Sequence, residues 1–400
     1  MVRLRDLGTW AGGNTPSKAN LAYWTDGTVP WVSPKDMKVH EITSSEDRIT
    51  ELALSDGRVS MVPAGSVLFV TRSGILSHTF PVAITKLPVT INQDLKALTP
   101  KEGVSPKYVA HAIRGASQRI LRDCAKHGTT VASIETSRLL DFEISIGGMR
   151  EQLEIVAELE KQFSRLDEAV ANLQRVKANL KRYKASVLKD AVEGRLVPTK
   201  GNWTTTKLGA VALSVRNGYS GKPDADAGTR IFRISAVRPM ELNTDDVRYL
   251  SGAASDFESF MAAEGDVLFT RYNGSRDYVG VCALVPSGLP PTVYPDKLIR
   301  VRVPTSVLLP AFVVIAASTG LGRNFIESMI RTTAGQSGVS GADIKAVPIS
   351  IPPLHEQVRI VAEVDSRLSL VRGVENEVDA NLKRAHALRQ SVLAKSFVGL

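Results

Sequence analysis

The sequence predicts an α+β protein with two tandem mixed domains, separated and joined by two long helices that form an antiparallel coiled coil with a pseudo-two-fold. The first observation is an internal repeat: the segment that begins Arg150-Glu151-Gln152 recurs as His355-Glu356-Gln357, 205 residues later. The second is that both copies carry apolar residues at heptad spacing over more than four heptads, a pattern typical of coiled coils. We therefore expect a first domain at 1–148, a first helical segment at 149–198, a second domain at 199–352 and a second helical segment at 353–400.

The composition is that of a globular protein with an excess of positive charge. Hydrophobic residues make up 43% of the 400 residues, which excludes wholesale disorder, and the formal net charge is +9. This charge favours an anionic partner, either nucleic acid or a membrane surface. No stretch approaches the ~20 apolar residues of a membrane helix, and the amino terminus lacks the apolar run of a signal peptide. Cys124 and Cys282 are far apart in the chain, so we expect a reducing cytoplasm rather than a disulfide framework.

Each of the two domains is expected to combine short strands with helices. In the first domain, apolar runs at 67–70 and 142–146 predict buried strands, and the spacing over 108–126 predicts a helix. The second domain repeats this order at 267–270, 347–351 and 311–331. Frequent Gly, Pro, Ser and Asn between these segments predict substantial loops.

The helical segments are too long to cover their own apolar stripes. From Arg150 to Gly194 a helix would extend roughly 67 Å, and the simplest partner for its stripe is the second copy in antiparallel orientation. Polar residues at a positions, among them Lys177 and Glu375, can set the register, and coincident helix ends would bring these two within about one turn. The apolar residues expected to pair the helices are Val156, Leu159, Leu166, Leu173, Leu180, Val361, Val364, Val371, Val378 and Leu382.

No catalytic signature stands out in the sequence. We find no phosphate-binding loop, no dinucleotide fingerprint and no nucleophile elbow. Cys124 and His127 are three residues apart but have no second ligand pair, so a zinc site is not expected. We therefore predict no catalytic or metal-binding residue, and binding is favoured over catalysis.

The candidate binding residues lie in loops that recur in both domains. Thr71-Arg72-Ser73 follows the strand at 67–70, and Thr270-Arg271-Tyr272 closes the strand at 267–270. A guanidinium can hold a phosphate or pair with guanine, and Asn or Ser nearby can contact adenine or the backbone. The alternative is an ordinary turn with a solvated arginine, which recurrence makes less favoured for these two loops; for the other loops both readings remain open. The full set of candidate DNA contacts is Asn14, Thr15, Ser17, Lys18, Ser33, Lys35, Arg72, Ser73, His127, Thr129, Arg216, Asn217, Tyr219, Lys222, Arg233, Arg271, Tyr272, Asn273, Arg276 and Gln336.

These residues resemble a known family over essentially the whole chain. The segment from Pro352 to Asp365, followed by a heptad helix that ends near Gly399, is similar to the conserved region of the DNA-specificity subunit of type I restriction-modification enzymes. The opening segments 13–17 and 29–33 resemble the same family. One departure is that the first helix follows Gly147-Gly148 without the usual prolines, which leaves its start open.

The resemblance implies a non-catalytic subunit with two target recognition domains. Each domain would read one half of a split double-stranded DNA target, and the paired helices would hold the gap between the halves. Because the two domains differ in sequence, the target should be asymmetric. Expected partners are two methyltransferase subunits and the restriction subunits, which would carry S-adenosylmethionine, ATP and Mg²⁺; no cofactor is expected on this chain.

Two other functions stay open at this point. The chain could be a stand-alone DNA methyltransferase or nuclease with an unrecognised motif, or a coiled-coil scaffold without a role in nucleic-acid binding.

Overall fold

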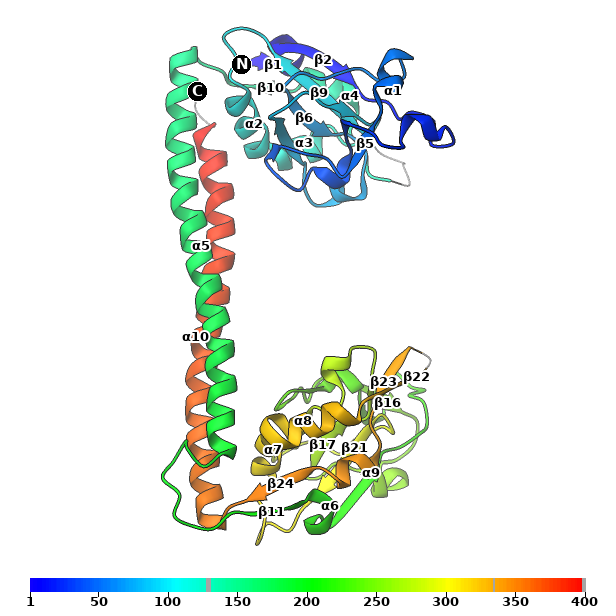
Figure 1. Ribbon diagram of the computed structural model, residues 1–400, viewed down its shortest axis with the longest axis vertical. Helices are drawn as coiled ribbons and strands as arrows, with labels where there is room; N and C mark the ends of the chain where they lie inside the picture. The colour runs from blue at the N-terminus through cyan, green and yellow to red at the C-terminus, as the bar shows by residue number, and fades with distance from the viewer. Residues whose placement is uncertain (127–130, 334, 398–400) are drawn as a thin grey trace. The chain divides into compact units, whose positions relative to one another are not determined.

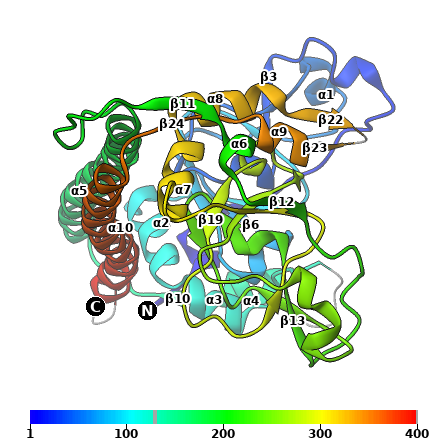
Figure 2. The same ribbon diagram turned by 90° about the horizontal axis from the view of Figure 1, so that it is seen from below.

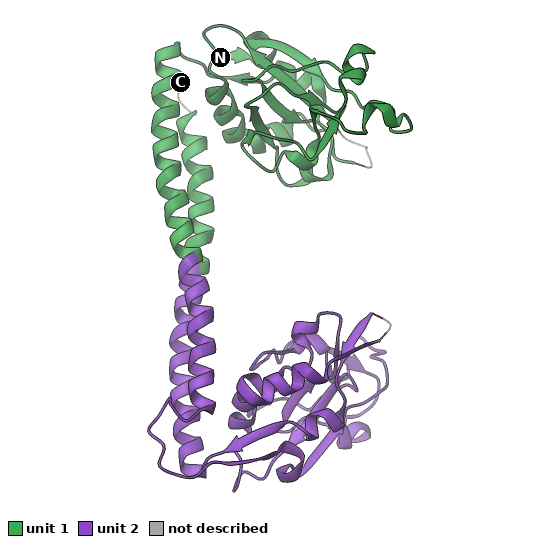
Figure 3. Cartoon of the chain, in the orientation of Figure 1, with its two compact units in different colours: residues 1–174, 379–400 green, residues 175–378 purple. Residues whose placement is uncertain are grey.

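The computed structural model describes residues 1–126, 131–333 and 335–397, which belong to two compact units. Unit 1 comprises residues 1–174 and 379–400, and unit 2 comprises residues 175–378 (Figure 3). Both boundaries fall inside the long helices, so each unit contains one mixed domain and a part of each helix. Among the helices described, none combines the length and apolar composition needed to cross a membrane.

The core of unit 1 is a five-stranded sheet with β6 at its centre (Figure 1). β6 spans Val67–Val70, the range expected from the sequence, and all four of its side chains are buried. An apolar residue at every position suits a central strand that is covered on both faces. The sheet order is β2 (Gly8–Gly12), β9 (Leu95–Pro100), β6, β7 (Val82–Thr85) and β4 (Glu41–Ile42). A second sheet contains β5 (Asp47–Ile49), β3 (Val29–Val32) and β8 (Thr90–Ile91), and β1 (Val2–Arg3) pairs with β10 (Glu143–Ile144).

Unit 2 repeats the order of the first four strands of the five-stranded sheet. Its central strand β17 spans Val267–Thr270, again as expected, and is buried throughout. The parallel pair β3 and β8 of unit 1 has its counterpart in the parallel pair β13 and β20. The main sheet of unit 2 has the order β12 (Ser214–Asn217), β21 (Leu298–Arg302), β17 and β19 (Cys282–Leu284). Two three-stranded sheets have the orders β16 (Val247–Leu250), β13 (Thr229–Phe232), β20 (Thr292–Val293) and β18 (Tyr272–Asn273), β23 (Gln336–Gly338), β22 (Arg331–Thr333). Two further pairs are β14 (Val237–Arg238) with β15 (Glu241–Leu242), and β11 (Thr204–Lys207) with β24 (Pro348–Ile351).

The helix expected within each domain is divided in two, so the prediction of one continuous helix is wrong in both. Unit 1 has α2 (Pro106–Gly115) and α3 (Ser117–Asp123), and unit 2 has α7 (Pro310–Ser318) and α8 (Gly320–Met329). The break in unit 2 has a clear cause: Thr319 is extended and Gly320 has a φ of 56°, which interrupts the helical backbone. The remaining short helices are α1 (Glu51–Ser55), α4 (Thr136–Asp141), α6 (Leu208–Val211) and α9 (Gly341–Lys345).

The long helices α5 (Met149–Val192) and α10 (Leu354–Ser396) pack side by side within each unit, as the two views in Figures 1 and 2 show. In unit 1, Leu159 and Phe163 cluster with Leu393, and Asp167 bonds Arg389 at 2.5 Å. Residue numbers therefore rise along α5 and fall along α10, which makes the pair antiparallel.

The ten residues expected to pair the helices are all buried or half-buried. Val156 and Val364 also belong to the hydrophobic cores of units 1 and 2, so the first turns of both helices pack into the mixed domains. Coincident helix ends would bring Glu375 close to Lys177, but the structure pairs Glu375 with Lys184, whose Nζ lies 2.6 Å from a Glu375 carboxylate oxygen. Lys184 lies one heptad further along α5, so the helices are staggered from the register that coincident ends would give.

Candidate nucleic-acid interface

In unit 1 the structure brings three of the predicted loops together around a segment that the sequence analysis did not single out, Asn92–Asp94. The Asn14 amide donates to Ile91 O at 3.0 Å, and the Thr71 amide donates to Asp94 O at 2.8 Å. Thr15 Oγ1 hydrogen-bonds to the Gln93 side chain. The loop at Ser33 joins them at an open groove of about 420 Å³, which is lined by Thr15, Lys18, Trp31, Ser33, Pro34, Lys35, Asp47, Asn92, Gln93 and Asp94.

A glycine at the same place in both units permits this close crossing of loops. A Cβ on Gly13 would lie 1.9 Å from Asn92 O, and one on Gly218 would lie 2.1 Å from Tyr294 O. Any side chain there would push the loop away from the sheet. Gly13 and Gly218 are 205 residues apart, the same shift as the helical repeat.

The arginine loops join a second chain segment to form a ribbon. In unit 2, β18 pairs with β23, and β23 pairs with β22 (Figure 1). Among the described residues of unit 1, the same pairing consists of two isolated bridges, Arg72 with Ser133 and Ala125 with Ile134. Two-stranded ribbons of this kind fit the major groove of B-DNA, where base edges can be read.

The loops of unit 2 converge in the same way as those of unit 1. The Asp296 amide donates to Tyr219 O at 2.7 Å, and the Arg271 amide donates to Lys297 O at 2.8 Å. The Val339 amide donates to Arg271 O at 2.9 Å, which joins the ribbon to this cluster. Each unit therefore carries a surface built from the same four chain segments, with different side chains.

The two arginines of these loops are offset by one residue, since Thr71 and Arg271 make the equivalent backbone contacts, and their surroundings differ. Arg72 is exposed, and its guanidinium has no hydrogen-bond or ion-pair partner among the described residues. Arg271 is half-buried: its Nη1 donates to Asp296 O at 3.4 Å and its guanidinium lies 4.7 Å from the ring centre of Tyr272. Arg72 can therefore turn toward a ligand freely, whereas Arg271 is held against its own domain.

Several other candidates have partners within their domain. Ser33 is buried directly before a short 3-10 helix (Pro34–Asp36), and its hydroxyl donates to Asp36. Lys35 forms ion pairs with Asp47 at 3.0 Å and Glu46 at 3.4 Å, and its hydrogen bond to Asp47 raises the pKa of Lys35. Arg233 lies 3.6 Å from an Asp246 oxygen. These contacts indicate structural roles.

In unit 2 two further candidates also contact their own domain. The ring of Tyr219 packs against Phe257 at 5.2 Å, between ring centres. Arg276 Nη2 donates to Glu327 O at 3.1 Å.

The candidates most available to a ligand are those whose side chains are exposed. Thr15, Ser73, Tyr219, Arg271, Tyr272 and Asn273 are half-buried. His127 and Thr129 lie outside the described residues. The exposed candidates are Asn14, Ser17, Lys18, Lys35, Arg72, Arg216, Asn217, Lys222, Arg233, Arg276 and Gln336, of which Lys35, Arg233 and Arg276 are less available because of the partners given above.

Sequence reasoning missed the central segments Asn92–Asp94 and Asp296–Lys297. Both are short polar runs directly before an apolar strand, β9 in unit 1 and β21 in unit 2. Their recurrence before equivalent strands is the signal that could have identified them.

Comparison with known proteins places these observations beside one family. Residues 1–181 match the family model described as the type I restriction modification DNA specificity domain. The chain is 32% identical over 311 residues to the specificity subunit of the type I restriction enzyme EcoKI from Escherichia coli (strain K12), covering 76% of this chain and 67% of that protein. It is 43% identical over 158 residues to the EcoR124I/EcoR124II specificity subunit of Escherichia coli, covering 40% of this chain and 39% of that one.

The fold is also similar to solved structures. A chain in a structure of the type I restriction-modification system, concerned with its assembly and conformational transition, has a TM-score of 0.76 at 18% identity, covering 100% of this chain and 97% of that chain. The HsdS subunit from Thermoanaerobacter tengcongensis has a TM-score of 0.57 at 19% identity, covering 100% and 96%. At these identities the likeness concerns the fold alone.

Proposed function

The chain belongs to the family of DNA-specificity subunits of type I restriction-modification systems, and from this premise we propose that it reads a bipartite, asymmetric double-stranded DNA target. The observation that carries the proposal is the repeated surface: unit 1 and unit 2 present the same four chain segments with unlike side chains. A repeated scaffold that carries different polar groups suits the recognition of two different half-sites. The net charge of +9 adds a salt-dependent attraction to any duplex.

The exposed polar side chains divide into two expected roles. Lys18 and Lys222 are flexible point charges suited to phosphate contacts, which set position but carry no sequence information. Arg72 and Gln336 lie on the ribbon side of each surface, where a guanidinium can pair with guanine and an amide with adenine. We expect discrimination between sequences to depend on this second group.

We infer that the chemistry is supplied by other subunits. The sequence has no phosphate-binding loop or dinucleotide fingerprint, in keeping with a subunit that recognises DNA and docks methyltransferase subunits. S-adenosylmethionine would then be bound by the methyltransferase subunits, and ATP and Mg²⁺ by the restriction subunits. The long helices, which join the two recognition domains, would determine the gap between half-sites.

The test is selection from a pool of random-sequence duplexes by the full chain with its methyltransferase subunits, followed by sequencing. The proposal predicts two unlike short motifs at one separation. A single continuous motif, or no enrichment even at low salt, would contradict it and favour a scaffold. Incubation of the chain alone with DNA and labelled S-adenosylmethionine distinguishes a stand-alone methyltransferase, which would incorporate label without a partner.

A further inference from the structure

Two glutamines stand at equivalent places in the first turns of the long helices. Gln152 is in α5 and Gln357 is in α10, 205 residues apart. Their exposed fractions are 1% and 0%, so both amides are withdrawn from water. A buried amide is unfavourable unless its donors and acceptor are bonded. The partners of these two amides therefore indicate what the glutamines do.

In unit 1, Gln152 joins three pieces of backbone. Its Oε1 accepts a hydrogen bond from the Ser105 amide at 2.9 Å. Its Nε2 donates to Gly103 O at 3.0 Å and to Gly147 O at 2.9 Å. Ser105 is the residue directly before α2, and Gly147 lies just before α5. The side chain thus ties the start of α5 to the start of α2 in the same unit.

In unit 2, Gln357 makes the same three contacts. Its Oε1 accepts from the Leu309 amide at 2.8 Å, and its Nε2 donates to Val307 O and Pro352 O, each at 2.9 Å. Leu309 directly precedes α7, as Ser105 precedes α2. Both domains therefore have the same arrangement where they meet their helix, a buried glutamine that makes three hydrogen bonds to backbone groups.

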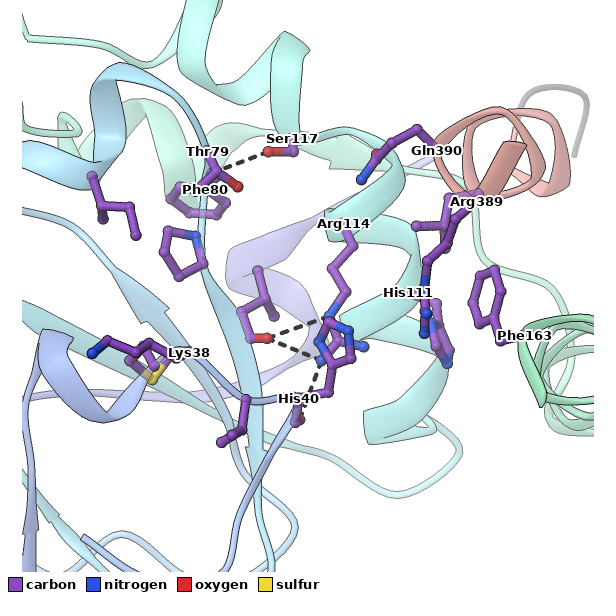
Figure 4. Close-up of a pocket in the computed structure, with 16 residues that line it drawn as sticks. Lys38, His40, Thr79, Phe80, His111, Arg114, Ser117, Phe163, Arg389 and Gln390 are labelled. Atoms are coloured by element: carbon purple, nitrogen blue, oxygen red, sulfur yellow. Dashed lines mark hydrogen bonds between the residues drawn. The ribbon is translucent and has the colours of Figure 1, made fainter. Parts of the chain in front are cut away.

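Further along the junction, the packing between domain and helices is incomplete in both units. In unit 1 a cavity of about 420 Å³ is lined by His111 and Arg114 from α2, Phe163 from α5 and Arg389 from α10 (Figure 4). In unit 2 a cavity of about 550 Å³ is lined by the counterparts of these elements, including Ser318 and Leu368. Since these open spaces add little resistance to rotation, we expect the hydrogen bonds at the helix start, together with the apolar contacts of Val156 and Val364, to fix the orientation of each domain.

We propose that Gln152 and Gln357 are positioning residues that hold each recognition domain at one orientation on its helix, and thereby limit the gap that the protein accepts between half-sites. The inference rests on the proposed function. Adding one base pair to the gap moves a half-site by about 3.4 Å and turns it by about 34° around the DNA axis. A domain that is locked to its helix cannot follow this movement, whereas a loosened domain can.

The test compares Gln152→Met, Gln357→Met and the double variant with the unaltered full chain. Methionine keeps the volume of the side chain but removes its hydrogen bonds. The matched control is Glu154→Gln, in the same turn of α5, where both Glu154 and its partner Arg150 are exposed. Duplexes from the selected target are then prepared with the preferred gap and with one base pair more or less.

Each Met variant should keep both half-site motifs, while its preference for the correct gap over its neighbours falls about tenfold, the change that about 1.4 kcal/mol produces. The control should keep the full preference. A Met variant with an unchanged preference would overturn the inference. If the unaltered chain bound both half-sites without preferring any gap, the inference would also be wrong, but the proposed recognition of DNA would still hold.

A second measurement decides the inference without DNA. Spin labels at Glu51→Cys on α1 and Glu168→Cys on α5 both lie in unit 1, where each native side chain is exposed. Gln152→Met should broaden the distribution of distances between the labels, and Gln357→Met should leave it unchanged. An unbroadened distribution in Gln152→Met would contradict the proposed positioning role. This result can be obtained even if the duplex selection contradicts the proposed function, so the two claims are tested separately.

Discussion

Acid should destabilise unit 1 through His111, a residue of α2 that lines the cavity in Figure 4. His111 is 9% exposed, its ring lies 5.7 Å from that of Phe163, and its Nδ1 has no hydrogen-bond partner among the described residues. Burial, followed by the nearby charge of Arg114, lowers the pKa of His111 from 6.5 to about 3.

The sign follows from comparing the two states. The unfolded chain takes up a proton at this histidine below pH 6.5, whereas the folded chain does so only near pH 3. The contribution to stability is therefore complete above pH 6.5 and is lost as the pH falls from 6.5 toward 3. Between pH 6.5 and 4.5 the loss is about 3 kcal/mol, at about 1.4 kcal/mol for each pH unit.

The assay is urea unfolding of the full chain at pH 7 and pH 4.5, for wild type and His111→Leu. Carboxylates titrate in both proteins, so the difference between the two pH dependences isolates His111. We expect the variant to lose about 3 kcal/mol less than wild type on acidification. The control is His78→Leu, because His78 is exposed, and it should retain the wild-type dependence. Equal losses in His111→Leu and wild type would refute the reasoning.

Three further predictions concern binding, the core of unit 2 and the gap. Arg72→Ala should weaken binding at one half-site by about 1–3 kcal/mol while unfolding changes by less than about 0.5 kcal/mol; equal weakening toward every sequence would mark Arg72 as a phosphate contact. Asp266→Ala should lower the free energy of unfolding by about 3 kcal/mol, because buried Asp266 bonds Arg302 at 2.5 Å and lies 3.9 Å from buried Arg300. Ser66→Ala, at the equivalent place in unit 1, removes a hydrogen bond to Thr99 and should lower it by about 1 kcal/mol. Denaturation curves with similar midpoints for the two variants would argue against this difference. Insertion of one heptad into both long helices should lengthen the gap selected from random duplexes, and an unchanged gap would speak against the helices as its determinant.

The repeat and the central strands could be predicted because they depend on local patterns. Apolar runs at 67–70 and 267–270 became β6 and β17 without a change of boundary. The breaks in the domain helices could not be predicted from spacing alone, since Thr319 and Gly320 leave the helical region while the apolar period continues across them. Helix spacing reports which face is buried and is insensitive to a single interrupted turn.

The candidate surface was predicted in part. Loops rich in Arg, Asn and Ser were identified from their chemistry, but the segments that gather them, Asn92–Asp94 and Asp296–Lys297, act mainly through backbone groups that every residue possesses. The sequence separates Arg72 from Arg271 only by their distance from the preceding strand, two residues after β6 and one after β17, whereas the contacts of Arg271 with Tyr272 and Asp296 cannot be read from it. Tertiary contacts decide which of two similar side chains is available.

The most direct test of two unlike reading surfaces on one repeated scaffold is to replace residues 199–352 with a second copy of residues 1–148 and to repeat the duplex selection. The account predicts that the first half-site is retained and that the second motif changes to another copy of it. Recovery of the original asymmetric target by this chimera would contradict the account.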